Sequence, residues 1–325
     1  MSTPTPAPLA TPASREFDDP VLRTGARRWR RGAGHLGRAA IGLVFLAAGV
    51  LKGLDPAEFA HQIDGYGLLG ARLSSIAAPA LIVLEITLAI TLLAGVWPRL
   101  SGLLSLALLF VFIGIEAYGL SVGRTEACGC FGAYVQRTPA EVIGEDLLFA
   151  GLVILALWGL AGWAGIRGRA AAAVLVATIV VSTVFVVASP SLPIDPYVTR
   201  LSVGKTLKDL ELKDRVPVLA AGRHLVVLLD VSDPGAADTA AIYNAIAARP
   251  GAPGIMGLTP STEQEIDTFL WSAVPAFEIH RVDRDVIKRL YRRLPRSFLI
   301  EGGRVTAVYD GAPPAVEDLL SSEAS

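Results

Sequence analysis

Two cysteines, Cys128 and Cys130, are the only thiols in the 325-residue chain, and a single glycine separates them. Two thiols one residue apart can reach each other, but the small ring departs from relaxed disulfide geometry. Such strain makes a disulfide oxidising and labile. Closing so short a loop would also add little stability. We therefore expect Cys128 and Cys130 to be a catalytic pair for thiol–disulfide exchange.

Two other interpretations of this pair stay open. The thiols could be unreactive loop residues, or they could bind a soft metal ion such as Cu(I). A structural zinc site usually needs four protein ligands, and the chain has no further cysteine. We predict no metal site.

Three ionisable residues, Lys52, Glu85 and Glu116, fall within or beside apolar stretches. A charge at mid-membrane costs about 2.5–3.5 kcal/mol on insertion scales, so such a residue usually faces a partner or a polar cavity. Lys52 and Glu116 have opposite charge and similar predicted depth, which allows them to pair. Glu85 would be protonated or bonded to a neighbouring helix. We expect these residues to act either as structural contacts or as polar support for a thiol or a quinone.

Apolar helices that cross a membrane must position these groups. Hydrophobic residues make up 52% of the chain and charged residues 18%, whereas a soluble domain carries roughly 25% charged residues. A spanning helix needs about 20 apolar residues. Five stretches approach or reach that length: Leu36–Leu54, Ile76–Trp97, Ser101–Leu120, Leu147–Ile166 and Ala170–Ala188.

Arginines predict the orientation of these spans. An arginine cluster between Arg23 and Arg38 precedes the first span and marks a cytoplasmic flank by the positive-inside rule. We interpret residues 1–33 as a disordered cytoplasmic tail. The protein then lies in a bacterial cytoplasmic membrane, with everything after the fifth span extracytoplasmic. Its net charge of −1 gives no global field that favours nucleic acid, so the bilayer is its first expected partner.

A soluble α/β domain is predicted for residues 203–325, after a proline-rich linker over residues 190–202. Short apolar runs such as His224–Asp230 alternate with helical segments, and Glu301-Gly302-Gly303 joins two strands in a hairpin. The expected architecture is a four-helix membrane bundle over residues 34–167, a fifth transmembrane helix over residues 168–189, and this soluble domain.

Residues 37–163 resemble the MauE/DoxX group of four-span membrane proteins, and MauE most closely. The stretches that carry the resemblance are GLVFLAAGVLKGLDPAEFAHQI, PALIVLEITLAITLLAG and CGCFG. The resemblance implies a redox-associated four-helix bundle of the kind linked to methylamine dehydrogenase maturation, in which disulfides form in the periplasm.

The C-terminal domain looks like a thioredoxin-like redoxin of the TlpA or peroxiredoxin type. VGKTLKDLELKD resembles the entry segment, HLVVLLD the strand before the active site, and LPRSFLIEGGRV the hairpin whose proline, here Pro295, is usually cis. Where that family carries Cys-x-x-Cys, this chain has Asp233-Pro234-Gly235-Ala236. By analogy, Pro295, Asp233 and Ala236 would border a client-binding surface that cannot exchange disulfides.

Two functions follow from these features. In the first, Cys128 and Cys130 accept electrons from a dithiol of a periplasmic or exported protein, and a quinone or another carrier reoxidises them. In the second, the protein is a non-catalytic assembly factor whose degenerate redoxin domain presents a client. Transport is disfavoured, because the spans carry few polar residues and no obvious inverted repeat.

Overall fold

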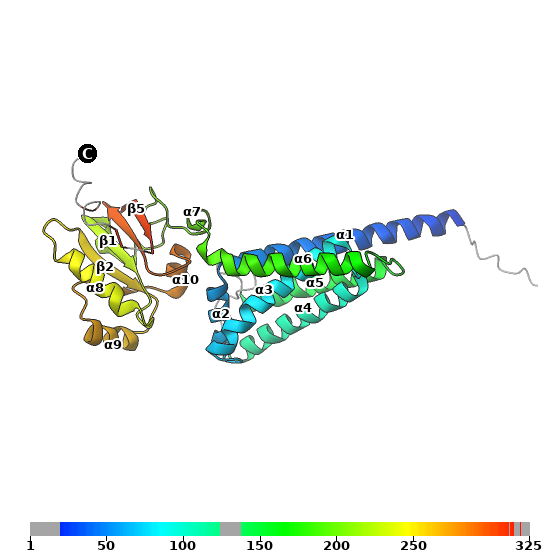
Figure 1. The fold of residues 1–325 in the computed structure, drawn as a ribbon, viewed down its shortest axis with the longest axis horizontal. Coiled ribbons are helices and arrows are strands. Elements are labelled where there is room, and N and C mark those ends of the chain that lie inside the picture. The colour runs from blue at the N-terminus through cyan, green and yellow to red at the C-terminus, as the bar shows by residue number, and fades with distance from the viewer. Residues whose placement is uncertain (1–19, 124–137, 312, 315–318, 320–325) are drawn as a thin grey trace, which may run out of the picture.

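The computed structural model describes residues 20–123, 138–311, 313–314 and 319. A bundle of long helices forms one end of the molecule and a mixed sheet with its helices forms the other (Figure 1). Within the described residues, five helices are long and apolar enough to cross a membrane. They are α1 (Pro20–Leu54), α3 (Ala71–Ala94), α4 (Pro98–Ser121), α5 (Pro139–Gly159) and α6 (Gly168–Ala188). The predicted membrane protein with five apolar helices is confirmed.

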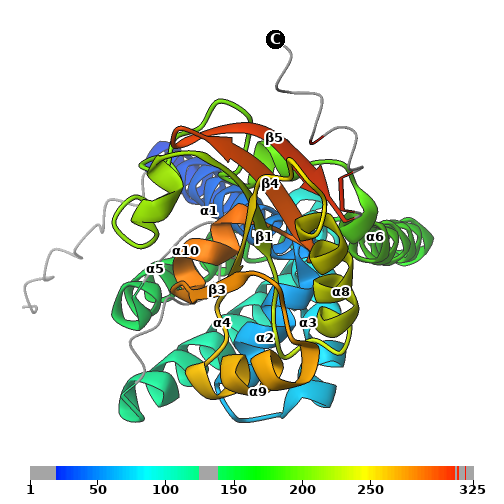
Figure 2. The same cartoon turned by 90° about the vertical axis from the view of Figure 1, so that its left-hand side faces the viewer.

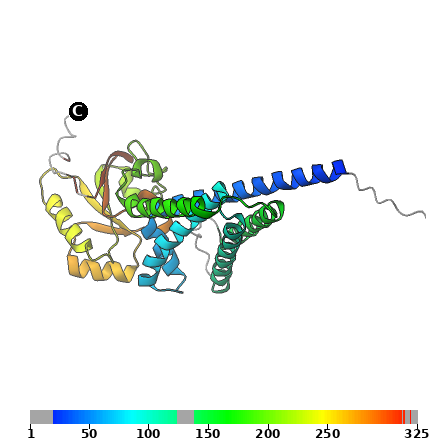
Figure 3. The ribbon, with the colours of Figure 1, turned by 45° about the vertical axis from the view of Figure 1, so that its right-hand side comes forward.

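The helices pack around an apolar interior and present leucine, isoleucine and valine side chains outward. Ile41 of α1, Leu92 of α3 and Val153 of α5 are among the buried residues, while Val181 and Val187 of α6 are exposed. Side chains that are apolar all round a helix suit a lipid environment. Figure 3 shows α4 beside α5, and the N-terminal part of α1 reaching beyond the bundle.

Two glycines bring α1 and α5 together. A Cβ atom on Gly159 would lie 2.5 Å from Gly34 Cα, and one on Gly34 would lie 2.8 Å from the backbone of Gly159. No side chain larger than hydrogen fits at this crossing. Small residues of this kind allow close helix contact where no hydrophobic force drives association.

The structure departs from the predicted boundaries at two places. Residues 20–33 begin α1, where we expected a disordered tail. The fourth span begins at Pro139, not at Leu147, because Thr138 and Glu141 cap α5 reciprocally. Asp146, which directly precedes the predicted span, therefore lies two turns inside α5.

A short helix, α2 (Pro56–Gly65), crosses the end of the bundle nearest the soluble domain (Figures 1 and 2). Its N-cap is Asp55, whose side chain accepts from the Glu58 N–H at 3.1 Å. After α6 the chain continues through η2 (Ser189–Ser191), which begins one residue before the predicted linker, and α7 (Asp195–Val198), which lies within it.

The C-terminal region contains a five-stranded mixed sheet of order β3-β2-β1-β4-β5. The strands β1 (Arg223–Leu228), β2 (Gly254–Thr259) and β3 (Glu278–Arg281) pair in parallel. The strand β4 (Arg296–Glu301) pairs antiparallel with β1, and β5 (Arg304–Asp310) pairs antiparallel with β4. Its remaining elements are η3 (Pro217–Ala220), α8 (Ala236–Ala247), α9 (Glu263–Ala273), α10 (Arg284–Ile287) and η4 (Lys288–Leu290).

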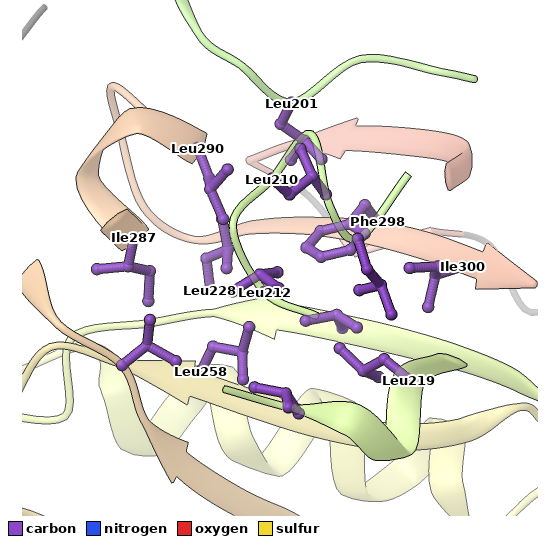
Figure 4. Packing of buried hydrophobic residues seen from close by; sticks show 14 of the residues in the cluster. Leu201, Leu210, Leu212, Leu219, Leu228, Leu258, Ile287, Leu290, Phe298 and Ile300 are labelled. Atoms are coloured by element: carbon purple, nitrogen blue, oxygen red, sulfur yellow. The ribbon is translucent and has the colours of Figure 1, made fainter. Parts of the chain in front are cut away.

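Alternating side chains of the sheet build two apolar layers. Leu225 and Val227 of β1 face α8 and α9, whereas Val226 and Leu228 face the opposite layer. In that second layer, Figure 4 shows leucines of residues 201–219 packed against the sheet, with Ile287 and Leu290 of the segment of α10 and η4 at one side of the cluster. The strand period of two thus puts apolar residues on both faces.

Candidate functional site

The predicted catalytic pair, Cys128 and Cys130, lies outside the described residues. The described chain ends at Gly123 after α4 and resumes at Thr138 before α5. Both points lie at the end of the bundle that faces the soluble domain (Figure 1). The residues at this end of the bundle, around Gly123 and Thr138, are therefore the described part of the candidate site.

A buried ion pair joins the first and second spans at this end. Lys52 Nζ of α1 contacts Glu85 Oε1 of α3, and both side chains are 2% exposed. Depth and charge allowed Lys52 to pair with Glu116, but in the structure Glu85 is its partner. The pairing compensates two charges that would otherwise be costly in an apolar bundle.

Two aromatic rings flank the Lys52 ammonium group. Its Nζ atom lies 5.2 Å from the centre of the Phe59 ring and 5.0 Å from that of Phe112. Ring faces attract a cation through their quadrupole, and more strongly where water is excluded. Phe59 comes from α2 and Phe112 from α4, so the ammonium group is held from three sides.

Two further acids lie near this pair. Glu116 of α4 is 3% exposed and accepts a hydrogen bond from Tyr66 Oη at 2.5 Å. Asp146 of α5 is also buried and is close enough to interact electrostatically with Lys52, Glu116 and Glu85. The predicted fourth span starts after Asp146, at Leu147, so the place of Asp146 in this cluster was not predicted from the sequence. The signal was the Thr138-x-x-Glu141 spacing, which moves the helix start upstream.

A cavity of about 200 Å³ opens beside Lys52. Its walls come from the end of α1, from α2 and the turn after it, and from α3 and α4. Apolar and aromatic side chains make up most of the lining, and Lys52, Gln62, Tyr66 and Glu116 supply the polar groups. A mostly apolar cavity with a few convergent polar groups is typical of a small-molecule site.

Acidic residues of the membrane segment bind basic residues of the soluble domain. Lys288 Nζ lies 2.9 Å from Asp55 Oδ2 and 3.5 Å from Glu58 Oε2. Arg284 also reaches Glu58, at 3.1 Å. Burial alone would lower the pKa of Lys288, but Asp55 and Glu58 outweigh it and raise that pKa above its ordinary value. We call these four residues the interdomain clamp.

Arg292 adds backbone contacts to this clamp. Its guanidinium donates to Leu54 O at 2.7 Å, to Ser189 O at 2.6 Å and to Leu192 O at 3.2 Å. Leu54 ends α1 and Ser189 follows α6, so one side chain satisfies carbonyl groups at the ends of two spans. A planar guanidinium suits several acceptors at once. The soluble domain is thereby fixed over the end of the bundle.

A second hollow, of about 80 Å³, lies in the soluble domain. The structure brings Asp233, Ala236 and Pro295 together there, beside Asp230, and the Leu294–Pro295 peptide bond is cis. Burial favours a raised pKa for Asp230, but hydrogen bonds from Ser232 and Ser261 hold it below its ordinary value. The hollow can bind polar groups, and none of the described residues that line it is a cysteine.

Comparison with known families gives one match. Residues 30–162 match the model of the family described as methylamine utilisation protein MauE. No curated protein and no solved structure matches the chain. The membrane segment that holds Lys52, Glu85, Glu116 and Asp146 is therefore MauE-like.

Proposed function

We propose that this protein is a redox-associated membrane protein that supports thiol–disulfide exchange, or the maturation of exported proteins, through Cys128 and Cys130. The observation that carries the proposal is the buried polar cluster around Lys52. It lies at the bundle end where the segment with the only two cysteines leaves α4 and returns to α5. The MauE-like segment supports the same assignment, with methylamine utilisation as its context.

The proposed reaction transfers two electrons from a client dithiol to the cysteine pair. A client thiolate attacks the Cys128–Cys130 disulfide and forms a mixed disulfide, which the second client thiol resolves. The client leaves oxidised, and the pair is left as two thiols. This chemistry belongs to the oxidising side of a bacterial cytoplasmic membrane, with the N-terminus in the cytoplasm and the soluble domain outside.

The soluble domain would act as a degenerate thioredoxin-like module. Its parallel and antiparallel strands, its cis-proline and its Asp233-to-Ala236 turn support this assignment. Because the turn lacks cysteines, the domain would bind an exported client near the membrane rather than oxidise it. The clamp to Asp55 and Glu58 supports a holding role, because it fixes the domain above the bundle.

A non-catalytic assembly factor is the second candidate. The observation that favours it is the thiol-free hollow beside Pro295 in a domain fixed to the membrane segment. In this case the protein would present a client to other enzymes, and the two cysteines would be dispensable.

Replacement of both cysteines separates the two candidates. The full-length protein in proteoliposomes, with its pair oxidised, is mixed with a reduced bis-cysteine peptide, and free thiols are counted by alkylation and mass spectrometry. We expect near-stoichiometric peptide oxidation by the parent protein and none by the Cys128→Ser/Cys130→Ser variant. The control is Ser121→Ala, at an exposed position of α4, which should behave as the parent. Equal oxidation by the double variant and the parent would refute the exchange function.

A further inference from the structure

The cavity beside Lys52 contains hydrogen-bonding groups that the described residues leave unused. The Lys52 ammonium has three N–H donors, and among the described residues Glu85 is its one acceptor. The side chain is 2% exposed and borders the cavity. Gln62 also lines the cavity, and its buried Oε1 receives no hydrogen bond from the described part of the chain. A buried polar group without a partner is destabilising, so these groups favour a ligand that can bond to them.

The charges around the cavity select against an anionic ligand. The positive charge of Lys52 is already balanced by Glu85, and Glu116 borders the same space. A fatty acid or a phosphate would therefore meet a lysine whose charge Glu85 already neutralises. An uncharged ligand with carbonyl oxygens fits better, because it can accept hydrogen bonds from Lys52 without bringing charge into the bundle.

The walls of the cavity suit a flat ring. The rings of Phe59 and Phe112 both lie near the Lys52 ammonium, and Tyr66 adds a third aromatic ring to the lining. An apolar cavity of roughly 150 Å³ is large enough to hold a benzene molecule, and this one measures about 200 Å³. Leu68 and Leu69, half exposed at the rim, offer an apolar exit for a chain attached to the ring.

We infer that the cavity binds the ring of an isoprenoid quinone, with Lys52 donating to a quinone carbonyl and Gln62 accepting from the hydroxyl of the reduced form. This inference rests on the proposed function and names its electron acceptor. Oxidation of two thiols to a disulfide releases two electrons and two protons. The quinone takes up both and becomes the hydroquinone, so the exchange balances.

Binding of decylubiquinone, a short-chain quinone, tests the site. The full-length protein in nanodiscs is titrated with the quinone, and the amount retained is extracted and measured by absorbance. Ile115→Phe fills the cavity from α4 and should raise the Kd at least tenfold. The same change at lipid-facing Ile154 of α5, which is 54% exposed, should leave the Kd unchanged.

Removal of the donor gives an independent variant. Lys52→Met alone would leave Glu85 buried without a partner, so it is combined with Glu85→Gln to keep the bundle neutral. This double variant should also bind at least tenfold more weakly, and laurate, an anionic amphiphile, should not displace the quinone from the parent protein. An unchanged Kd in both cavity variants, or displacement by laurate, would overturn the inference.

The cysteines distinguish this inference from the proposed function. Cys128→Ser/Cys130→Ser should bind decylubiquinone as the parent does, because the cavity lining named here contains neither residue. Quinone binding without thiol chemistry would remove the proposed function and keep the site. Reversible thiol chemistry together with an unchanged Kd in the cavity variants would keep the proposed function and remove the quinone site.

Discussion

Replacement of Lys288 by methionine tests whether the interdomain clamp holds the soluble domain over the bundle. Methionine keeps much of the length and the apolar stem of lysine but removes the charge. Lys288 is buried against Asp55 and Glu58, so its loss leaves two carboxylates facing an apolar side chain. The substitution therefore changes the electrostatics of the interface more than its packing.

The free energy of docking that Lys288→Met removes follows from the burial of Lys288 and from the contacts that remain. Removing one partner of a buried ion pair typically costs about 3–5 kcal/mol, because the other charge is left uncompensated. Glu58 keeps its contact with Arg284 at 3.1 Å, so the expected cost lies at the lower end of this range, at about 3 kcal/mol. Since roughly 1.4 kcal/mol is a tenfold change, the ratio of docked to undocked protein should fall about a hundredfold.

Spin-label distances measure docking directly. Nitroxides are attached to Arg72→Cys, at the start of α3, and Gln264→Cys, on α9, in a Cys128→Ser/Cys130→Ser background. Both sites are exposed. The parent should give one narrow distance distribution, and Lys288→Met a broad one.

The matched control is Lys213→Met, an exposed lysine in the same domain, which should change stability by no more than about 0.5 kcal/mol and keep the narrow distribution. Adding Asp55→Asn to Lys288→Met should restore part of the docking by removing one uncompensated charge. An equally narrow distribution in Lys288→Met and in the parent would show that the clamp does not hold the domain.

Three further predictions concern the same architecture. Arg292→Lys should broaden the spin-label distribution as well, because an ammonium group cannot satisfy three carbonyl acceptors in the plane of a guanidinium; a narrow distribution would contradict this. Gly159→Ala should lower the midpoint of thermal unfolding in detergent, because the new Cβ would lie 2.5 Å from backbone atoms of α1. The control is Gly151→Ala in the same helix, whose Cβ would meet nothing within 4 Å, and it should leave the midpoint unchanged. Because the pKa of Lys288 is raised, the stabilisation that Lys288 contributes is complete below the ordinary lysine pKa of about 10.4 and is lost as pH rises through the raised pKa. Spin-label distances should therefore stay constant from about pH 7 to about pH 9. A transition within that range would argue against a charged Lys288.

The sequence predicted the local elements well where their patterns are strong. The five apolar helices follow from length and composition, and the strand from His224 and the hairpin at Gly302 follow from period-two apolar runs and a glycine turn. The fourth span was misplaced because hydropathy marks the apolar stretch, whereas the helix begins at the Thr138 cap. Hydropathy patterns do not register a polar cap upstream of an apolar stretch.

The candidate site was less predictable, because it depends on how helices rotate against one another. Lys52, Glu85 and Glu116 were recognised one by one as unusual in apolar segments. The partner of Lys52 was not, because similar predicted depth indicated Glu116, whereas the packing of α1 against α3 brings Glu85 to the ammonium group. The clamp between Asp55 and Lys288 joins residues far apart in the sequence, and no local pattern indicates such a contact.

The redox behaviour of Cys128 and Cys130 tests the central claim most directly. The purified protein in mild detergent is equilibrated in a series of glutathione redox buffers, and its free thiols are trapped with an alkylating mass tag. We predict one reversible two-electron transition at a potential well above about −300 mV, the range of labile disulfides. Thiols that never pair at any accessible potential would contradict the exchange function and leave the assembly-factor role.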